Sequence, residues 1–459
     1  MINKLTKLLD SRYAYLYILF FEGVVSVSVQ FLFLRHLLPY VGSSITVSSL
    51  VISIYLLFLS LGYYAAGRAN DFYLSRLSGN LLKAALLITL GMSPVISELY
   101  FYFTGRIDNT ASLIVYALLF LAPSVYWLGQ TMPLLSNAVQ SDIKAEISAT
   151  VLFYSTIGNV VGGLFSVFVL IKFFGLGVAI AVNVSILLVL SVVCASEKRI
   201  SVLSKSIALV FAVFVFVYYP YRAFDIANAY SNYKVINVSA KKSAELIKSF
   251  GESARIMIGN NVMQSGINIG KEGSFFPYVE KFRSFIRTLP EESRILVLGA
   301  GGYTLGEGDR VRKYVYVDID PELQAYVEKY FLQKKINGDS VASDARKYLI
   351  VSKEMFDVIV LDTFSAKDAI PQHLVTAEYF ALVKSRVRNG GYVLINTIQD
   401  GGFSNEKSNS LHMTINHVFP YCRVYGLSPD FRSGKPENVV YLCRNVDEAL
   451  IYSDTKLNN

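Results

Sequence analysis

A glycine turn and a set of spaced aspartates carry the chemistry that this sequence suggests. Residues 295–320 read ILVLGAGGYTLGEGDRVRKYVYVDID, a buried strand that enters the turn GAGG at Gly299, followed by a second strand that ends in acids. A glycine turn lets backbone amides approach a ligand closely, and Asp318, 19 residues after Gly299, can accept both hydroxyls of a ribose. We therefore predict a nucleoside pocket.

Two further aspartates narrow the choice of nucleoside. The dinucleotide fingerprint requires glycine or alanine where Thr304 stands, and the chain has no GxxxxGKS or GxxxxGKT loop to hold phosphates. Asp344, in the sequence SDAR, and Asp362, after the apolar run FDVIVL, add carboxylates to the same edge. Successive acids in a pocket suit a cationic sulfonium, so we predict S-adenosylmethionine or its decarboxylated form as co-substrate.

Alternating strands and helices must position these residues. After Pro290 the strands ILVLGAG, YVYVDID, FDVIVLD and YVLINTI alternate with the helices PELQAYVEKYF and TAEYFALVKSRV, and we predict that GDSVASDARKYL is a loop. This order predicts a doubly wound, Rossmann-like α/β domain over 291–459, with ligands at the carboxyl ends of parallel strands. The preceding residues, 221–290, alternate like short strands and predict a small β domain.

The first half of the chain has a different composition. The chain is 53% hydrophobic, yet only 13 of its 43 Lys and Arg and 8 of its 35 Asp and Glu lie in residues 1–220. Apolar runs of the length that crosses a bilayer, about 20 residues, occur there repeatedly. They lie near 13–34, 44–66, 80–103, 111–135, 148–171 and 175–195, with a shorter run at 203–220. We predict a multi-span helical membrane domain of six or seven spans in a bacterial plasma membrane.

The side of the membrane depends on the number of spans. Lys and Arg crowd into the loops that share a side with the N-terminus, which places that end in the cytoplasm. Seven spans would then place the C-terminal domain outside the cytoplasm, and six spans, or a re-entrant segment, would place it inside. We expect the cytoplasmic side, because nucleoside cofactors are made there.

Several other residue types bear on structure or partners. Glu22, in the first span, either faces a polar cavity or bonds a neighbouring helix, and the pair Gly158 and Gly162 predicts close helix packing. Cys422 and Cys443 lie in two runs that suit a hairpin, and we expect free thiols unless the domain lies outside the cytoplasm. The four histidines lack metal-site spacing, and the balanced charge of the C-terminal half disfavours nucleic acid.

At this point the sequence resembles the spermidine synthases, or polyamine aminopropyltransferases, in their membrane-fused bacterial branch. The most specific part is LDTFSAKDAIPQHLVTAEYF at 361–380, which is similar to that branch's signature D-x-F-S-x-D-A-I-P-x-H-L-x-T. The resemblance covers roughly 230–445. It implies transfer of an aminopropyl group to an amine, with release of methylthioadenosine, and it allows a homodimer.

The resemblance also implies a role for each matching residue. Asp362 takes the place of the catalytic acid, which must hold an amine and accept its proton. The implied cofactor-binding residues are Gly299, Gly301, Asp318, Asp344, Ala345 and Gln264, and the implied substrate-binding residues are Tyr278, Glu280 and Asp368.

Two departures from the family leave other functions open. Soluble members have an acid where this chain has Gly302 and another where it has Ser365, and Asp368 is a candidate replacement. Without those acids, intact S-adenosylmethionine could cyclise through its own carboxylate to methylthioadenosine and homoserine lactone. A third hypothesis, of another class, is a membrane sensor or transporter gated by a nucleoside or polyamine.

Overall fold

The computed structural model describes most of the chain, and the chain divides into two compact units, Met1–Asn232 and Tyr233–Asn459. The described residues are 12–41, 45–68, 72–104, 109–138, 144–195, 199–221, 224–228, 230–239, 253–260, 262–363, 372–427 and 436–446.

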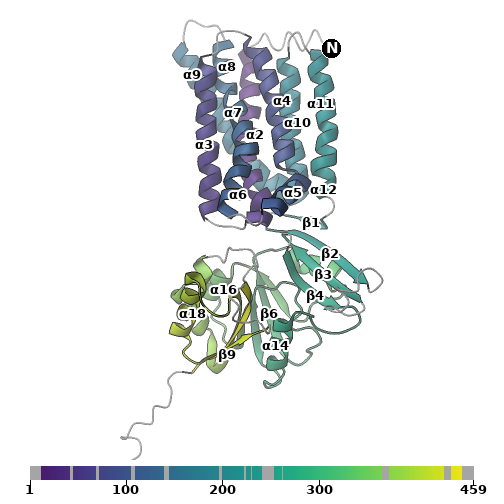
Figure 1. The fold of residues 1–459 in the computed structure, drawn as a ribbon, viewed down its shortest axis with the longest axis vertical. Helices are drawn as coiled ribbons and strands as arrows, with labels where there is room; N and C mark the ends of the chain where they lie inside the picture. Colours follow the sequence, from purple (N-terminus) through teal and green to yellow (C-terminus); the bar gives the residue numbers. More distant parts are fainter. Residues whose placement is uncertain are drawn as a thin grey trace, which may run out of the picture. The chain divides into compact units, whose positions relative to one another are not determined.

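The first unit is a bundle of helices that run roughly parallel to a common axis (Figure 1). Its α-helices are α2 (Arg12–Val41), α3 (Ile45–Gly67), α4 (Tyr73–Gly91), α5 (Pro94–Thr104), α6 (Asn109–Tyr116), α7 (Ala122–Gly129), α8 (Thr131–Ala138), α9 (Lys144–Phe165), α10 (Leu176–Cys194), α11 (Arg199–Val213) and α12 (Tyr219–Tyr221). Three π-helical segments continue them, namely η1 (Ala117–Leu121), η2 (Ser166–Phe174) and η3 (Phe214–Tyr218), and a two-residue strand, β1 (Ile226–Ala227), follows.

Six continuous helical segments in the described residues are long and apolar enough to cross a membrane. A seventh crossing is counted if α4 and α5, which bend by 60° at a short break, form one span. Many of their large apolar side chains, such as Phe211 and Phe168, are exposed on the outside of the bundle. Length, composition and this outward apolar surface are all compatible with the membrane domain that the sequence predicts.

Helices α2 and α9 pack with almost no side chain between them. A Cβ atom on Gly158 would lie 2.2 Å from the carbonyl oxygen of Phe20, and one on Gly162 would lie 2.1 Å from that of Val24. Only glycine permits this approach, so the packing role predicted for the two glycines is confirmed. Glu22, which lies in α2, is only 4% exposed, so the bundle encloses it.

The second unit begins with a small antiparallel sheet. It contains β2 (Asn232–Ser239), β3 (Ser253–Gly259) and β4 (Val262–Asn268), with β3 in the middle of the three. The register shifts between Met257, which pairs with Ser265, and Ile258, which pairs with Met263. Gln264 is the extra residue of this β-bulge, and a bulge changes the direction of the side chains beside it.

A seven-stranded sheet follows, in the order β10-β11-β9-β8-β5-β6-β7. The parallel strands are β5 (Arg294–Leu298), β6 (Lys313–Asp318), β7 (Asp339–Ala342), β8 (Phe356–Leu361) and β9 (Val387–Asp400), and β10 (Cys422–Gly426) and β11 (Pro436–Arg444) are antiparallel additions. The helices of this unit are α14 (Pro277–Ile286), α15 (Leu323–Tyr326), η4 (Val327–Phe331), α16 (Ala345–Val351), η5 (Gln372–Leu374), α17 (Ala377–Lys384) and α18 (Glu406–Val418). The predicted Rossmann-like sheet is confirmed.

The segment GDSVASDARKYL is not the loop that we predicted. It contains β7 and the start of α16, and Asp344 caps that helix by accepting a hydrogen bond from the backbone N–H of Lys347 at 2.9 Å. The strand is short and polar because it lies at the edge of the sheet, where one side faces solvent. Sequence periodicity is weakest for such strands.

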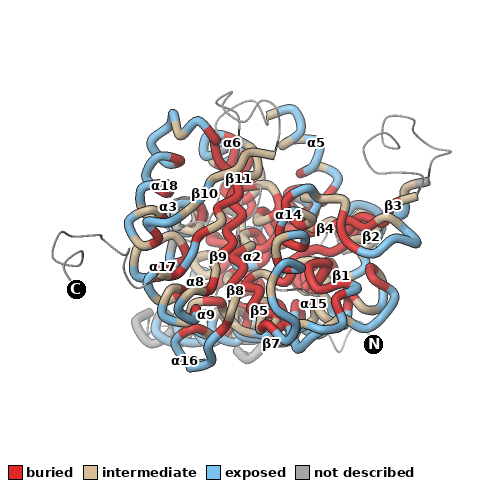
Figure 2. The backbone as a smooth tube through the Cα atoms, turned by 90° about the horizontal axis from the view of Figure 1, so that it is seen from below, coloured by how far each residue is buried: buried red, intermediate tan, exposed pale blue. Residues whose placement is uncertain are grey.

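The middle strands form the core of this unit. Strands β5 and β8 are almost wholly buried, as Figure 2 shows, and their residues Leu296, Leu298, Ile359 and Leu361 are each 0% exposed. A parallel strand covered on both faces needs a continuous apolar run, which is the pattern of ILVL and FDVIVL.

The hairpin of β10 and β11 carries a disulfide. Cys422 pairs in register with Cys443, and the two are joined across the strands. The expected hairpin is confirmed, but the expectation of two free thiols is wrong, because the antiparallel register places the two side chains directly opposite each other.

Candidate functional site

The glycine turn lies at the carboxyl end of β5 and touches the end of β8. Gly299 has φ +90°, and a Cβ atom there would lie 2.3 Å from the carbonyl oxygen of Asp362. Gly301 also has a positive φ of +51°. Glycine is favoured at both positions by the backbone conformation, and at Gly299 also by the neighbouring strand. The turn therefore stays bare, and its backbone can approach a ligand.

Asp318 ends β6 beside this turn. Its carboxylate accepts hydrogen bonds from the backbone N–H of Ala300 at 3.0 Å and from that of Asp320 at 3.1 Å. Burial raises the pKa of Asp318, although these backbone hydrogen bonds act in the opposite direction. The two bonds fix the carboxylate at the edge of the turn, which is where a ribose acceptor was predicted.

Asp362, directly after β8, is held by two side chains from other elements. Tyr278, in the first turn of α14, donates from Oη to one carboxylate oxygen at 2.9 Å. Asn396, in β9, donates from Nδ2 to the other oxygen at 2.8 Å. Because each oxygen has its own donor, the carboxylate plane is fixed relative to the turn at Gly299.

The environment of Asp362 makes it a better proton acceptor than an ordinary aspartate. Burial raises its pKa, and the hydrogen bonds from Asn396 and Tyr278 partly oppose that rise. Burial and the charge of Asp362 both raise the pKa of Tyr278 well above its usual value, so the phenol stays protonated. A carboxylate with a raised pKa, held in place, is suited to general base catalysis.

These groups line one cavity. Its lining includes Gln264, Ser265, Tyr278, Gly299, Gly301 and Asp362. The structure therefore brings together four of the cofactor and substrate residues that the sequence predicts with the predicted catalytic acid. The side chain of Gln264 lies against Gly259 on the neighbouring strand, since a Cβ atom on Gly259 would meet its amide at 2.3 Å.

The position of Gly302 is closed to a larger residue. A Cβ atom there would lie 2.4 Å from Oγ of Ser265 and 2.6 Å from Cε1 of Phe331. Ser265 is itself buried, at 3% exposed. An acid at this position would therefore require Ser265 or Phe331 to move.

Asp344 and Ala345 lie just beyond the carboxyl end of β7, the next strand after β6 in the sheet. Nε2 of His373 lies 3.1 Å from the second carboxylate oxygen of Asp344. Burial alone would raise the pKa of Asp344, but hydrogen bonds from Lys347 and His373 lower it. The residue is therefore ionised at neutral pH, as an acceptor for an adenine amino group should be.

The predicted substrate residue Glu280 is not in the cavity lining, and neither are the predicted cofactor residues Asp318, Asp344 and Ala345. The carboxylate of Glu280 accepts a hydrogen bond from the backbone N–H of Ser274 at 2.8 Å and lies 3.2 Å from the guanidinium of Arg283. Arg283 in turn donates to the carbonyl oxygen of Thr304 at 2.5 Å. Asp368 and Ser365 lie outside the described residues.

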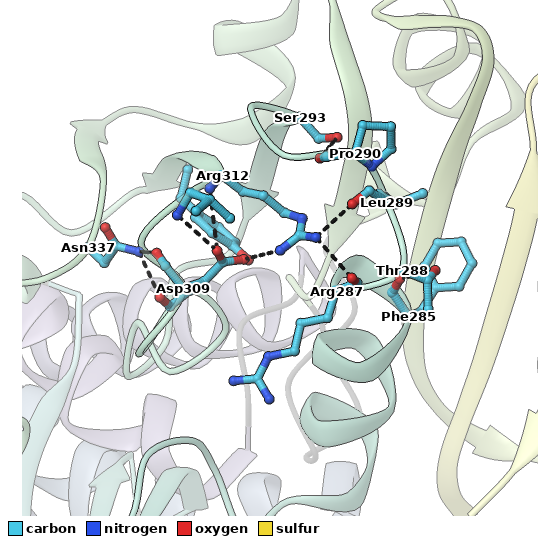
Figure 3. Close-up of polar contacts among 12 residues, drawn as sticks. Phe285, Arg287, Thr288, Leu289, Pro290, Ser293, Asp309, Arg312 and Asn337 are labelled. Atoms are coloured by element: carbon cyan, nitrogen blue, oxygen red, sulfur yellow. Dashed lines mark hydrogen bonds and ion pairs between the residues drawn. The ribbon is translucent and has the colours of Figure 1, made fainter.

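A buried arginine holds the segment that follows the turn (Figure 3). Arg312 donates to the carbonyl oxygens of Arg287 and Leu289, at 2.9 and 2.6 Å, and pairs with Asp309 at 3.2 Å. Asp309 also accepts from Oη of Tyr314 at 2.9 Å. These contacts tie 309–314 to the residues that follow α14.

Relatives among characterised proteins match this C-terminal region. The chain is 31% identical over 131 residues to the polyamine aminopropyltransferase of Vibrio vulnificus, covering 27% of this chain and 44% of that protein. It is 36% identical over 138 residues to that of Sulfurisphaera tokodaii, covering 28% and 45%. The chain resembles the polyamine aminopropyltransferases. The chain spans less than half the length of these two relatives.

One aminopropyltransferase-like relative matches much more of the chain. It is polyamine aminopropyltransferase 2 of Aquifex aeolicus, 20% identical over 416 residues, covering 86% of this chain and 81% of that protein. This alignment is longer than either unit, so it includes residues of both. A probable spermidine synthase from Corynebacterium glutamicum has a TM-score of 0.40 and 20% identity, covering 49% of this chain and 81% of that one. No family model matches the chain.

Sequence reasoning missed three residues of this aminopropyltransferase-like site. Asn396 and Ser265 contact the predicted residues Asp362 and Gly302, and His373 contacts Asp344. Of the three, Asn396 has a signal in the sequence, because it is an amide that interrupts the apolar run YVLINTI.

Proposed function

We propose that this chain is a membrane-integrated enzyme that transfers an aminopropyl group from decarboxylated S-adenosylmethionine to an amine. The bond between the propyl carbon and the sulfonium sulfur breaks, and a bond from that carbon to the amine nitrogen forms. Methylthioadenosine leaves as the neutral thioether, and the amine loses one proton. The names of the relatives and the geometry of the Asp362 site support this proposal.

One observation carries the proposal. Asp362 lines the cavity and touches the glycine turn. Tyr278 and Asn396 each fix one of its two carboxylate oxygens. An ammonium with a pKa of about 10 is not a nucleophile at neutral pH, so the reaction needs a group that binds it and accepts its proton. The raised pKa of Asp362 suits that task.

The other residues would hold the sulfonium nucleoside. Asp318 would accept the ribose hydroxyls and Asp344 with Ala345 would contact adenine, while the bare turn at Gly299 and Gly301 would let the backbone approach. This arrangement would fix the reacting carbon near Asp362, and orientation of that kind supplies much of the rate of a two-substrate reaction. Gln264, Glu280 and Asp368 stay proposed contacts of the substrates.

Mutation of Asp362 tests the proposed chemistry. D362N should lower kcat by about 10²- to 10⁴-fold, the usual contribution of a general base, and should still bind methylthioadenosine. The measurement is product formation from decarboxylated S-adenosylmethionine and putrescine, with binding followed by calorimetry. The matched control is D339N, at the exposed amino end of β7, which should keep wild-type turnover. Full activity in D362N would refute the assigned role.

A second candidate is supported by Gly302. Since Ser265 and Phe331 occupy the space where an acid would stand, the cavity has fewer countercharges for an amine. Intact S-adenosylmethionine could then cyclise, with its carboxylate attacking the carbon bonded to sulfur, to give homoserine lactone and methylthioadenosine. This reaction needs no external amine.

Product analysis separates the candidates. Purified protein should be incubated with either form of the co-substrate, with and without putrescine, and every product identified. Spermidine from the decarboxylated form alone supports aminopropyl transfer. Methylthioadenosine from the intact form without an amine supports cyclisation and contradicts the first proposal. A sensor or transporter would form neither product, and D362N would leave its response unchanged.

We also propose that the first unit spans a bacterial plasma membrane. The number, length and outward apolar surface of its helices support this placement. Membranes washed with alkaline carbonate should retain the full-length chain, whereas release into the supernatant would contradict integration.

A further inference from the structure

We infer that the aminopropyltransferase-like unit faces an oxidising compartment outside the cytoplasm. The inference rests on the proposed membrane integration and not on the proposed chemistry. It departs from the expectation that cofactor supply keeps this unit in the cytoplasm. Three independent features of the chain support it, namely where the first unit ends, where its basic residues lie, and the disulfide.

The first unit ends beside the C-terminal part of α2. His36, near the end of that helix, has Nδ1 2.6 Å from Oη of Tyr221, the last residue of α12. Arg35 donates from Nε to the carbonyl oxygen of Asn228 at 2.8 Å and from Nη2 to Oδ1 of Asn232 at 2.9 Å. The chain therefore leaves this unit at the end of the bundle where α2 stops.

Helix α2 separates that exit from the N-terminus. Its apolar segment, Tyr15–Val41, has 27 residues. At a rise of about 1.5 Å per residue this is roughly 40 Å, which exceeds the hydrocarbon core of about 30 Å. A single helix of that length places its two ends on opposite faces. The conclusion holds however the bent pair α4 and α5 is counted.

The bent pair gives the same answer. Near its start, α4 places Ser78 against Ser191, close to the end of α10, with Oγ of Ser78 donating to the Ser191 carbonyl at 2.8 Å. At its other end, the carbonyl oxygen of Gly91 accepts from Oη of Tyr116. Ser97, in α5, then lies 2.6 Å from Nε2 of His36. Thus α4 runs the length of the bundle, as Figure 1 shows, and α5 stays at the exit end.

Basic residues mark the N-terminal end as cytoplasmic. By position in the sequence, nine belong to the segments that precede, join or begin the helices on that side, and four to the segments at the exit end. The nine are Lys4, Lys7, Arg12, Arg68, Arg76, Lys144, Lys198, Arg199 and Lys205, and the four are Arg35, Arg106, Lys172 and Arg222. Of the four, Arg35 is buried, at 6% exposed, and already bonds Asn228 and Asn232. Lys and Arg accumulate in cytoplasmic loops, so the exit lies on the other face.

The disulfide lies entirely within the second unit, so it supports the inference independently of the helices of the first unit. Cys422 and Cys443 are joined across β10 and β11. Disulfides persist in oxidising compartments and are rare in the cytoplasm, where thiol reductants keep cysteines reduced. The aminopropyl donor and the amine would therefore have to be present outside the cytoplasm, which requires a transport step before the reaction.

Cysteine accessibility tests the side directly. In sealed spheroplasts of a bacterial host, a membrane-impermeant maleimide should label S410C, on the exposed face of α18, and spare S75C, in the first turn of α4. Detergent should expose S75C. The parent protein is the control, because Cys194 is buried and the other two cysteines are joined. Labelling of S75C with protection of S410C would overturn the inference.

The redox state supplies a second readout that needs no mutation. Cells are quenched with N-ethylmaleimide, and the peptides containing Cys422 and Cys443 are analysed without reductant. A linked pair of peptides supports the oxidising compartment. Two alkylated peptides in the protein from its native membrane would overturn the oxidising compartment, even if S410C were labelled from outside.

Discussion

Asn396 helps to set the protonation state of Asp362 in the aminopropyltransferase-like site. It donates to Asp362 from the neighbouring strand and is itself 2% exposed, so its amide has little freedom to reorient. A donor that bonds the ionised carboxylate favours the ionised form. Asn396 therefore opposes the effect of burial and keeps Asp362 usable as a base near neutral pH.

The variant N396A should shift the pH dependence of the reaction. Loss of this donor raises the pKa of Asp362 further, so a smaller fraction is ionised at a given acidic pH. The acid limb of kcat/KM should move upward by roughly one pH unit, since one unit corresponds to about 1.4 kcal/mol. Activity should recover as the pH rises. N409A, on the exposed face of α18, is the control, and an unshifted profile for N396A would contradict the assignment.

Residues at strand ends were predictable, whereas their partners were not. Gly299, Asp318 and Asp362 follow apolar runs, and parallel strands bring their carboxyl ends to one edge. Asn396 required the register between β8 and β9, where Leu361 is opposite Ile395 and thus Asp362 is next to Asn396. Ser265 required the bulge at Gln264, which no sequence pattern indicated.

At the scale of elements, the pair of Arg312 and Asp309 links the residues that follow α14 to the segment that precedes β6. The side chains are 8% and 5% exposed. Arg312 bonds two carbonyl oxygens and Asp309, and Asp309 also accepts from the phenol of Tyr314. Burial alone would raise the pKa of Asp309, but hydrogen bonds from Tyr314 and Arg312 lower it. Above the pKa that Asp309 has in the unfolded chain, its carboxylate contributes its full stabilisation. That stabilisation is lost as the pH falls through the lower pKa that Asp309 has in the folded protein.

Replacement of Arg312 should therefore be costly. R312A removes the cation that pairs with a buried carboxylate and the donor of two carbonyl oxygens, and we expect a loss of about 3–5 kcal/mol in unfolding free energy. Denaturant unfolding of the detergent-solubilised protein measures it. R310A changes an exposed arginine two residues away and should stay within about 0.5 kcal/mol. Equal losses of unfolding free energy in R312A and R310A would show that the loss comes from removing a positive charge and not from the buried contacts of Arg312.

The close packing of α2 against α9 can also be tested by mutation. A methyl group in G162A would meet the backbone of Val24, at 2.1 Å from its carbonyl oxygen, so the helices must separate. We expect a lower unfolding temperature in detergent. A Cβ on Gly79 of α4 would meet nothing within 4 Å, so G79A should be neutral or stabilising, because alanine favours helix by up to about 1 kcal/mol. A stable G162A would contradict the packing role.

At the scale of the whole molecule, the sequence predicted the order of the helical bundle and the α/β sheet, but it did not predict the edge strand or the disulfide. Apolar runs gave the helical bundle and alternating strands gave the sheet, because hydrophobic periodicity is a local property. The short polar strand β7 and the disulfide were mispredicted, because an edge strand and a cross-strand pair depend on partners distant in sequence.

The bonds of Arg35 also determine where the chain can be cut. Removal of residues 222–232 would take away the Asn228 carbonyl and the Asn232 amide and leave a guanidinium, 6% exposed, inside the end of the bundle. A membrane fragment that stops at Asn232 keeps these acceptors, whereas one that stops at the predicted boundary, residue 220, lacks them together with Tyr221. Separate expression of the two units should therefore succeed or fail according to the twelve residues 221–232.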